Sequence, residues 1–292
     1  MASLRTAVVV NPTKCDAEQL RKDVHALLTD AGWPPPAWYE TTADSPGADQ
    51  ATQAVRAGAR IVFACGGDGT VRSCVDALAG SQAALAVLPA GTGNLLAGNL
   101  GLPTDVPAAV DVALHGNRRR IDVGRVDGLR FAVAAGMGFD ADLLHDAPAA
   151  LKRSVGWLAY VVSALRHLGG PSLTVDIALD DGPPRRHRVR TVLVANVSEL
   201  RGGLSVAPEA SDHDGRFDVV VVAPRRPVDW LGVVYKTLRR QPHDQVLRRT
   251  AAAVDVHVVK TVANRQLDGD PIEPSDRLTV RMEPEALEVC VP

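Results

Sequence analysis

The hydrophobic positions of residues 1–124 form short apolar runs that alternate with amphipathic segments. Short apolar runs bounded by polar or glycine-rich residues are typical of strands covered on both faces. They predict strands at Thr6–Val10, Trp38–Thr41, Arg60–Ala64 and Leu85–Leu88. The intervening segments predict a helix that Asp16 caps and Gly32 ends, and helices at Ala48–Gly58, Thr70–Leu78 and Asn94–Leu100. This alternation predicts a parallel α/β sheet with helices on both faces.

The apolar positions of residues 125–292 follow a different rhythm. Between Leu173 and Leu179 every second residue is apolar, which is the period of a strand. Further strands are predicted at Val189–Val197, Phe217–Val222, Val254–Val262 and Leu278–Met282, with helical stretches at Leu151–Leu168 and Val228–Arg240. This pattern predicts a β-rich domain arranged as a sandwich. We therefore divide the chain into domains 1–124 and 125–292, with the seam inside Arg119–Asp127, and leave open whether the last strand returns to the first domain.

Composition changes this picture by excluding several classes of protein. The 292 residues suffice for two domains, and 46% hydrophobic with 23% charged residues is typical of a soluble globular protein. A net charge of −2 supplies no general attraction to nucleic acid. The longest apolar run with a helical pattern, Trp157–Leu165, is about half as long as a membrane span. We expect no secretory signal, because Val8–Val10 is followed at once by Asn11-Pro12.

The cysteines show neither CxxC spacing nor a histidine at metal-ligand spacing; they are Cys15, Cys65, Cys74 and Cys290. This pattern indicates reduced thiols rather than disulfides or a metal site. We therefore expect a soluble, cytoplasmic chain.

Candidate chemistry begins where the strand Arg60–Ala64 runs into Cys65-Gly66-Gly67-Asp68-Gly69-Thr70. Glycines let the backbone approach a phosphate, and the N–H groups that open the next helix favour negative charge. Asp68 fits such a site if it holds Mg²⁺, accepts a proton or orders the loop. Taken alone, the segment is more simply a tight strand-to-helix turn.

Two further polar loops follow strands of the same sheet. Pro89-Ala90-Gly91-Thr92-Gly93-Asn94 follows one strand, and Asn11-Pro12-Thr13 follows another. Because ligands bind parallel sheets at the carboxyl ends of the strands, three such loops predict one continuous phosphate-binding crevice. The chain contains neither a Walker A loop nor the dinucleotide GxGxxG fingerprint.

These three loops resemble those of the diacylglycerol kinase catalytic family, which includes bacterial lipid kinases, sphingosine kinases and ceramide kinases. The resemblance continues in order through Arg120–Gly124, Gly136–Ala141, Pro208–Ala210, Asp214–Val219 and Leu267–Asp270, and so covers almost the whole chain. It implies an NAD kinase/diacylglycerol kinase-like first domain, a β-sandwich domain that helps receive a lipid, and ATP in the cleft between them. The implied reaction is ATP-dependent phosphorylation of a lipid hydroxyl with Mg²⁺, most directly diacylglycerol giving phosphatidic acid for phospholipid biosynthesis.

The resemblance also implies a nucleotide site. Its residues are Asn11, Pro12, Thr13, Lys14, Cys15, Thr41, Gly66, Gly67, Asp68, Gly69, Thr70, Val71, Arg72, Ser73, Gly91, Thr92, Gly93 and Asn94. The sequence departs from the family at Arg72-Ser73, where a polar pair such as Asn-Glu is common, and at Lys14-Cys15, where the family has a small Ser-Gly ending.

Three carboxylates are candidates for the proton acceptor. The family supplies it from an Asp-Gly-Glu near the C-terminus, where this chain has Asp268-Gly269-Asp270. We hold Asp270 and Asp268 jointly as candidates, since Asp270 is one methylene shorter than the expected glutamate. Asp68 is the third, because the sphingosine kinase branch gives its counterpart this role. A β-hairpin turn is the alternative for the Asp-Gly pair.

The resemblance also implies a separate Mg²⁺ site at Ser211, Asp214 and Arg216, where one side-chain carboxylate and backbone carbonyls would form an oxygen set suited to Mg²⁺ or Ca²⁺. An ordinary Asp-Gly turn is the equal alternative.

Two arginine-rich clusters could contact a membrane surface transiently or be solvated faces; they are Arg185, Arg186, Arg188 and Arg190, and Lys236, Arg239, Arg240, Arg248 and Arg249. The expected partner is thus a lipid substrate, and a homodimer stays open.

Two other functions compete with a lipid kinase. NAD kinases and phosphofructokinases also carry a GGDG loop, although the Pro89–Asn94 and Gly136–Ala141 segments favour the lipid group. A non-enzymatic nucleotide or lipid sensor on the same fold is the second, motivated by Asp270 and by the Arg72-Ser73 pair.

Overall fold

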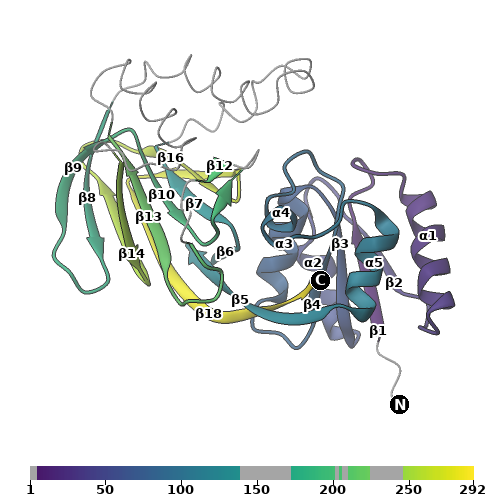
Figure 1. Cartoon of the computed structure of the whole chain (residues 1–292). Coiled ribbons are helices and arrows are strands. Elements are labelled where there is room, and N and C mark those ends of the chain that lie inside the picture. The colour runs from purple at the N-terminus through teal and green to yellow at the C-terminus, as the bar shows by residue number, and fades with distance from the viewer. Residues whose placement is uncertain (1–4, 139–171, 201–203, 206–209, 224–245) are drawn as a thin grey trace. The chain divides into compact units, whose positions relative to one another are not determined.

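The computed structural model describes residues 5–138, 172–200, 204–205, 210–223 and 246–292 (Figure 1). It divides the chain into two compact units, residues 1–123 with 284–292 and residues 124–283. The helical stretches expected at Leu151–Leu168 and Val228–Arg240 lie outside the described residues. Within those residues, no helix has both the length and the apolarity needed to cross a membrane.

The first unit is built on a parallel sheet with strand order β2-β1-β3-β4 (Figure 1). The strands are β1 (Arg5–Val10), β2 (Ala37–Glu40), β3 (Ala59–Gly66) and β4 (Ala84–Pro89). The end of the long strand β18 (Arg277–Val291) pairs in parallel with β4, where Val289 lies opposite Leu85. The parallel α/β sheet predicted from the apolar runs is confirmed.

Helices cover this sheet on both sides (Figure 1). They are α1 (Ala17–Asp30), α2 (Ala48–Arg56), α3 (Asp68–Leu78), α4 (Leu95–Asn99) and α5 (Val106–His115). Asp16 caps α1 by accepting the Gln19 N–H at 3.0 Å. Apolar residues of α1 and α5 form one cluster with alternate residues of the strands, whereas α2 packs against α3. Helix α5 is not among the expected helices, because its mostly apolar sequence shows no distinct polar face.

The second unit contains two antiparallel sheets, in the orders β18-β15-β8-β9 and β14-β13-β10-β7-β16-β17. The new strands are β7 (Ala134–Met137), β8 (Leu173–Leu179), β9 (Arg185–Val189), β10 (Thr191–Ala195), β13 (Phe217–Val222), β14 (Val246–Ala251), β15 (Ala253–Val258), β16 (Ala263–Leu267) and β17 (Asp270–Ser275). Strands β5 (Asn117–Val126) and β6 (Leu129–Phe131) precede them, and β11 (Glu199–Leu200) pairs with β12 (Leu204–Ser205). The predicted β-rich domain is confirmed.

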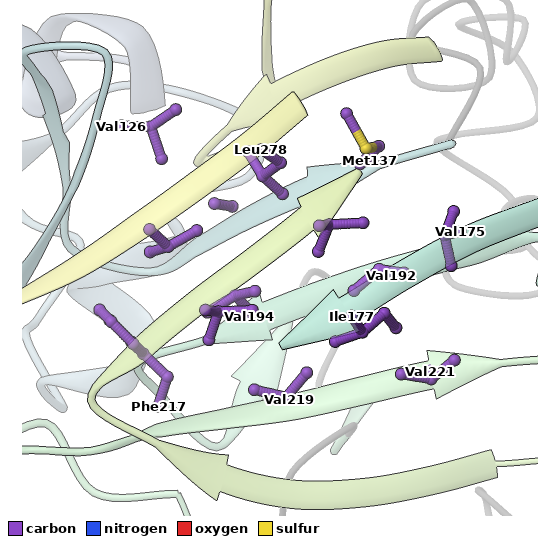
Figure 2. Close-up of a cluster of buried hydrophobic side chains, with 14 of the residues drawn as sticks. Val126, Met137, Val175, Ile177, Val192, Val194, Phe217, Val219, Val221 and Leu278 are labelled. Atoms are coloured by element: carbon purple, nitrogen blue, oxygen red, sulfur yellow. The ribbon is translucent and has the colours of Figure 1, made fainter. Parts of the chain in front are cut away.

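Side chains of both sheets share one buried core (Figure 2). Val175 and Ile177 of β8 lie in this core with Val192 and Val194 of β10 and with alternate residues of β13. The rings of Phe131 and Phe217 stack with centroids 5.8 Å apart. Because alternate residues of each strand face the core, the two sheets form a sandwich.

The structure corrects three of the expected strands in this unit. The apolar run Val189–Val197 is not one strand, because β9 pairs with β8 whereas β10 pairs with β7 and β13, and the chain changes sheets at Arg190. The strand expected to reach Val262 ends at Val258. The strand expected at Leu278–Met282 is instead the fifteen-residue β18. Apolar runs mark buried residues but not the sheet in which those residues pair.

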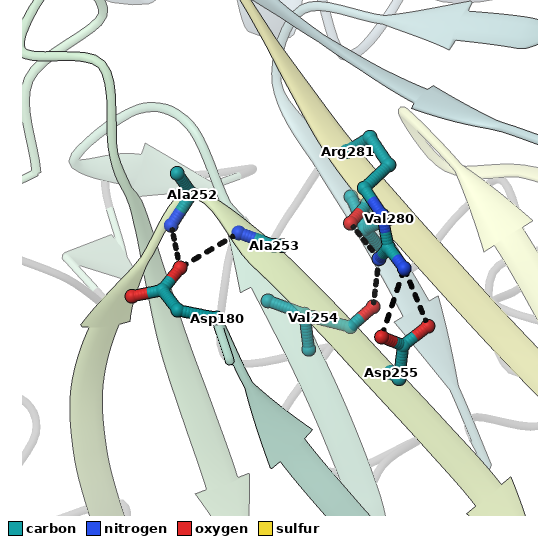
Figure 3. Close-up of polar contacts among 7 residues, drawn as sticks. All are labelled: Asp180, Ala252, Ala253, Val254, Asp255, Val280 and Arg281. Atoms are coloured by element: carbon teal, nitrogen blue, oxygen red, sulfur yellow. Dashed lines mark hydrogen bonds and ion pairs between the residues drawn. The ribbon is translucent and has the colours of Figure 1, made fainter. Parts of the chain in front are cut away.

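Polar contacts join neighbouring strands of the sandwich outside its apolar core (Figure 3). Asp180, after β8, accepts the Ala252 and Ala253 N–H groups at 2.8 and 3.0 Å and pairs with Arg216 at 3.0 Å. Desolvation opposes ionisation of Asp180, but these donors outweigh it and lower its pKa below the usual range. Across the next strand pair, Arg281 binds both carboxylate oxygens of Asp255 at 3.1 and 2.9 Å.

Candidate functional site

Three loops follow strands of the first unit at the carboxyl ends of those strands. We name them the β1 loop (Asn11–Cys15), the β3 loop (Gly67–Gly69) and the β4 loop (Ala90–Asn94). Hydrogen bonds between backbone groups already bring the strand ends together, since Asn11 N donates to Cys65 O at 2.8 Å and Ala90 N donates to Gly66 O at 3.0 Å. The structure therefore places all three loops at one edge of the sheet, which is where ligands bind in folds of this kind.

Asn11 ties the β1 loop to the start of α3. Its Nδ2 donates to Thr70 Oγ1 at 3.4 Å, while its Oδ1 accepts the Thr13 N–H at 3.0 Å and the Thr13 hydroxyl at 2.8 Å. One side chain thus sets both the turn of the β1 loop and its attachment to the first turn of α3, which follows the β3 loop. The Lys14 side chain that follows is exposed.

Asp68 links the β3 loop to the β4 loop. Its Oδ2 accepts the Asn94 N–H at 3.1 Å and its Oδ1 accepts the Leu95 N–H at 2.6 Å, so the first residue of α3 caps the start of α4. Of the three roles considered for Asp68, these contacts support the ordering of the loop. A carboxylate is well suited to it, because both of its oxygens accept hydrogen bonds.

Asn94 and Gly91 close the β4 loop on itself. Asn94 has a left-handed backbone with φ of 47°, its Oδ1 accepts the Gly91 N–H at 2.9 Å, and its Nδ2 donates to Gly91 O at 3.1 Å. A Cβ on Gly91 would lie 2.7 Å from Gly67 Cα, a separation that real Cβ atoms do not show. The close contact between the β3 and β4 loops therefore requires glycine at position 91.

The residues expected at a nucleotide site differ in what they can offer a ligand. The side chains of Pro12, Thr13, Lys14 and Thr92 are exposed, whereas Thr41, Gly66, Thr70, Val71 and Ser73 are buried. Ser73 donates its hydroxyl to Gly69 O at 2.8 Å within its own helix, and Thr41 N donates to Val10 O at 2.9 Å. The remaining residues are partly exposed: Asn11, Cys15, Gly67, Asp68, Gly69, Arg72, Gly91, Gly93 and Asn94. The buried residues of this set therefore stabilise the loops rather than offer side chains to a ligand.

The Asp268-Gly269 pair forms a two-residue turn between β16 and β17. Leu267 lies opposite Asp270, and the turn residues have φ of 51° and 91°, the geometry of the turn that Asp-Gly favours in hairpins. The hairpin alternative considered for this motif is therefore present. It leaves Asp270 as the first residue of β17.

Asp268 has a buried carboxylate that is bound by backbone groups. Its Oδ1 accepts the Val133 and Ala134 N–H groups at 2.9 and 2.8 Å, and its Oδ2 accepts the Ala132 N–H at 3.0 Å. Only 5% of Asp268 is exposed. Its side chain thus holds the hairpin against the segment that joins β6 to β7.

Gln266 supports the same hairpin from the other side. Its Oε1 accepts the Gly269 N–H at 2.6 Å. Gln266 lies opposite Gly136 of β7, where a Cβ would come within 2.7 Å of Gln266 Nε2. Because Gly136 has no side chain, the Gln266 side chain can extend past it to the turn. Asp270, which follows this turn, is partly exposed.

The Ser211–Arg216 segment forms a polar loop before β13. Asp214 Oδ1 accepts the Arg216 N–H at 3.0 Å, and Arg216 donates its guanidinium to Asp180 and to Thr250 O, each at 3.0 Å. Ser211 Oγ lies 3.2 Å from His213 Nδ1. Among the described residues, no three His, Cys, Asp or Glu side chains cluster in a way that could hold a metal. The hydroxyl, carboxylate and carbonyl oxygens of this loop still match the donors that Mg²⁺ takes, so the loop fits Mg²⁺ in donor chemistry.

The structure thus joins the three loops within the first unit, while the Asp268–Asp270 hairpin and the Ser211–Arg216 loop belong to the second. Sequence reasoning did not identify Gln266 as part of the site, nor Ala132–Ala134 as the partner of Asp268. The one local signal for Gln266 is a polar residue in a half-buried strand. The Asp268 contacts span about 135 residues of sequence and leave no local pattern.

Comparison with known proteins matches both units. Residues 5–126 match the family model described as the diacylglycerol kinase catalytic domain, and residues 132–291 match the YegS C-terminal NAD kinase beta sandwich-like domain. A diacylglycerol kinase of Bacillus subtilis (strain 168) is 31% identical over 271 residues, which cover 89% of this chain and 84% of that protein.

Two further proteins extend this comparison. A probable YegS-like lipid kinase of Chromohalobacter salexigens is 34% identical over 59% of this chain and 57% of its own length. The crystal structure of a diacylglycerol kinase from Bacillus anthracis str. Sterne aligns with a TM-score of 0.81, covering 100% of this chain and 98% of that chain at 20% identity. This structural match shows the fold.

Proposed function

The chain belongs to the diacylglycerol kinase family of lipid kinases, and we propose that it transfers the γ-phosphoryl group of ATP to a lipid hydroxyl. Diacylglycerol, which would give phosphatidic acid, is the first acceptor to test, because the Bacillus subtilis relative that matches over 84% of its length bears that name. The observation that carries the proposal is the linkage of three polar strand-end loops by Asn11 and Asp68.

The three loops would bind the nucleotide and hold its phosphates in position, without forming a covalent bond to it. Gly67, the N-cap of α3, has no side chain to accept the first N–H groups of that helix, so they can face phosphate oxygens. The exposed Lys14 and Thr92 side chains border the same edge of the sheet. Phosphoryl transfer needs mainly such positioning and charge stabilisation.

We assign the proton acceptor to Asp270 among the three candidates. Asp270 stands where the family has its glutamate, and it is partly exposed. Both carboxylate oxygens of Asp68 and of Asp268 accept backbone N–H groups, so removing either would release a loop or a turn. In the proposed step the lipid hydroxyl oxygen attacks the γ-phosphorus, the bond to the β–γ bridging oxygen breaks, and ADP leaves. The hydroxyl proton passes to the Asp270 carboxylate. Asp268 and Gln266 are then positioning residues for Asp270.

Mg²⁺ is the metal that this chemistry requires, and it would neutralise the β- and γ-phosphate oxygens. The Ser211–Arg216 loop would hold a separate Mg²⁺ through Asp214, the Ser211 hydroxyl and backbone carbonyls near Arg216.

The lipid acceptor also implies transient contact with a membrane surface, for which the exposed Arg185, Arg186 and Arg188 of β9 are candidates.

The test is a transfer assay with γ-labelled ATP and Mg²⁺ over a panel of acceptors. The lipid arm contains diacylglycerol, phosphatidylglycerol and a sphingoid base in mixed micelles, and the second arm contains NAD and sugar phosphates. We expect labelled phosphatidic acid. Labelled NADP or sugar bisphosphate would contradict the lipid assignment and favour a small-molecule kinase. Binding of ATP without transfer to any acceptor would favour a sensor on the same fold.

A further inference from the structure

Two free cysteines meet at the edge of the sheet that carries the three loops. Cys65 is the seventh residue of β3, and Cys15 ends the β1 loop. Val10 lies opposite Cys65 in the β1–β3 pairing, and Asn11 N donates to Cys65 O at 2.8 Å. The β1 loop then brings Cys15 back over this position, so that the two sulfur atoms lie 3.7 Å apart.

This separation is short enough for a covalent bond to form with a small loop movement. A disulfide has a sulfur–sulfur distance of about 2 Å, so each sulfur would need to move by less than about 1 Å if both shared the approach. Cys15 belongs to a loop with a partly exposed side chain, whereas Cys65 is buried in the sheet. The loop is therefore the part that would move.

We propose that Cys15 and Cys65 form a thiol-oxidation site, at which a peroxide or a small-molecule disulfide converts the pair to a disulfide. With a peroxide, the Cys15 sulfur attacks one peroxide oxygen, the oxygen–oxygen bond breaks, and Cys15 becomes a sulfenic acid with release of water. The Cys65 sulfur then attacks the Cys15 sulfur, and a second water leaves. The two thiols are oxidised by two electrons and the peroxide is reduced.

The surroundings of the two thiols set the order of these steps. Burial, with a smaller contribution from neighbouring Cys15, raises the pKa of Cys65 far above its usual range, so its thiolate is scarce near neutral pH. Cys15 is the thiol that solvent and oxidant can reach, and it reacts first. Closure by Cys65 is then the slower step and should accelerate as pH rises.

Closure of the disulfide would act on the nucleotide site that we propose, and this consequence depends on that function. The β1 loop contains the exposed Lys14 and Asn11, whose Nδ2 donates a hydrogen bond to Thr70 Oγ1 in the first turn of α3. Pulling Cys15 towards β3 would displace this loop against α3. We expect the affinity for ATP to fall several-fold on oxidation and to recover on reduction.

Tryptic peptide mapping can identify which two cysteines form the disulfide. Trypsin cleavage after lysine and arginine leaves the four cysteines on four separate peptides, residues 15–21, 61–72, 73–118 and 282–292. We expect hydrogen peroxide or oxidised glutathione to produce, in the folded protein, a cross-link between peptides 15–21 and 61–72 that dithiothreitol removes. Cys74 and Cys290 serve as internal controls, because burial raises their pKa to about 12 and about 11.

The controls separate this site from general oxidation. Cys15→Ser should abolish the cross-link, and its ATP affinity, measured against its own untreated level, should no longer respond to oxidant. Irreversible oxidation of Cys15 without a cross-link, or a cross-link of Cys15 to Cys74 or Cys290, would overturn the proposal. An unchanged ATP affinity in the cross-linked protein would overturn its effect on the nucleotide site. Failure of the reduced protein to bind ATP would count against the proposed function, while the peptide map would still decide the oxidation site.

Discussion

At the residue scale, aspartates of this chain hold backbone segments together over long sequence distances. Asp68 joins two loops of the first unit, and Asp268 binds three successive N–H groups of the second. Hydrogen bonds to a buried carboxylate are costly to remove, because the donors lose their partner in a place that water does not reach. Such residues are needed for a site to form even when they do not react.

The contrast between Asp268 and Asp270 gives the sharpest test at this scale. Asp268→Asn leaves one amide oxygen for three N–H donors, so we expect the free energy of unfolding to fall by about 1–3 kcal/mol. Asp270→Asn should lower kcat by at least about a hundredfold. Thermal unfolding and steady-state kinetics on both variants measure the two effects. A stable but inactive Asp268→Asn beside an active Asp270→Asn would reverse our assignment.

Gln266 should act through the turn rather than on the substrate. Gln266→Ala removes the acceptor of the Gly269 N–H, and we expect kcat to fall about tenfold with the KM for ATP unchanged, since small displacements of a reacting group slow transfer. Gln266→Glu keeps a carboxyl oxygen at the same reach and should restore most of the rate. Equal losses in Gln266→Ala and Gln266→Glu would show that the contact with Gly269 is not what matters.

At the element scale, polar contacts join neighbouring strands of the second unit. Asp180 follows β8 and binds the backbone where β14 meets β15, while Arg281 of β18 binds Asp255 of β15 (Figure 3). These contacts lie outside the apolar core shared by the two sheets. Asp180 fixes the backbone at a strand end, whereas Arg281 and Asp255 join two paired strands across their exposed side.

The Asp180 contact predicts a dependence of stability on pH. Its pKa is lowered in the folded chain, so its contribution is present above the unfolded pKa of about 4 and is lost as pH falls through the folded value. We expect Asp180→Asn to lower the free energy of unfolding by at most about 1 kcal/mol at pH 7, because its side chain is 42% exposed and solvent screens the contact. The difference from the parent chain should shrink below about pH 4. The neighbouring Asp181→Asn is the matched control, and an equal loss there would refute a specific contact.

At the scale of the whole molecule, β18 serves both units. Its first part pairs with β15, and its end pairs with β4. Within the first unit, Asp122 Oδ1 accepts the Glu285 N–H at 2.8 Å and Arg120 donates to Glu285 O at 2.9 Å, so the Arg120–Gly124 motif binds the start of the last part of β18. Residues 284–292 are therefore part of the first unit although they end the chain.

Deleting residues 284–292 should therefore destabilise the first unit. The deletion removes the buried side chains of Leu287, Val289 and Cys290, a loss of roughly 5 kcal/mol of apolar burial, which is comparable to the whole stability of a small domain. We expect trypsin to cleave within residues 1–123 far faster than in the full chain. Removal of the exposed Pro292 alone is the control. Unchanged protection of residues 1–123 would contradict a structural role for the end of β18.

The sequence by itself determined the strands of the first unit, its helices other than α5, and the three loops, because apolar period and glycine-rich turns are local properties of the chain. It also placed the β-rich character of the second unit, although not the change of sheet at Arg190. Only the tertiary structure decided which carboxylates hold loops, that Gln266 supports the hairpin, and that Cys15 lies beside Cys65. These features join residues from 3 to more than 130 positions apart, and most arise from how strands order themselves within a sheet. Strand order is fixed by packing among all the elements, and no local pattern carries it.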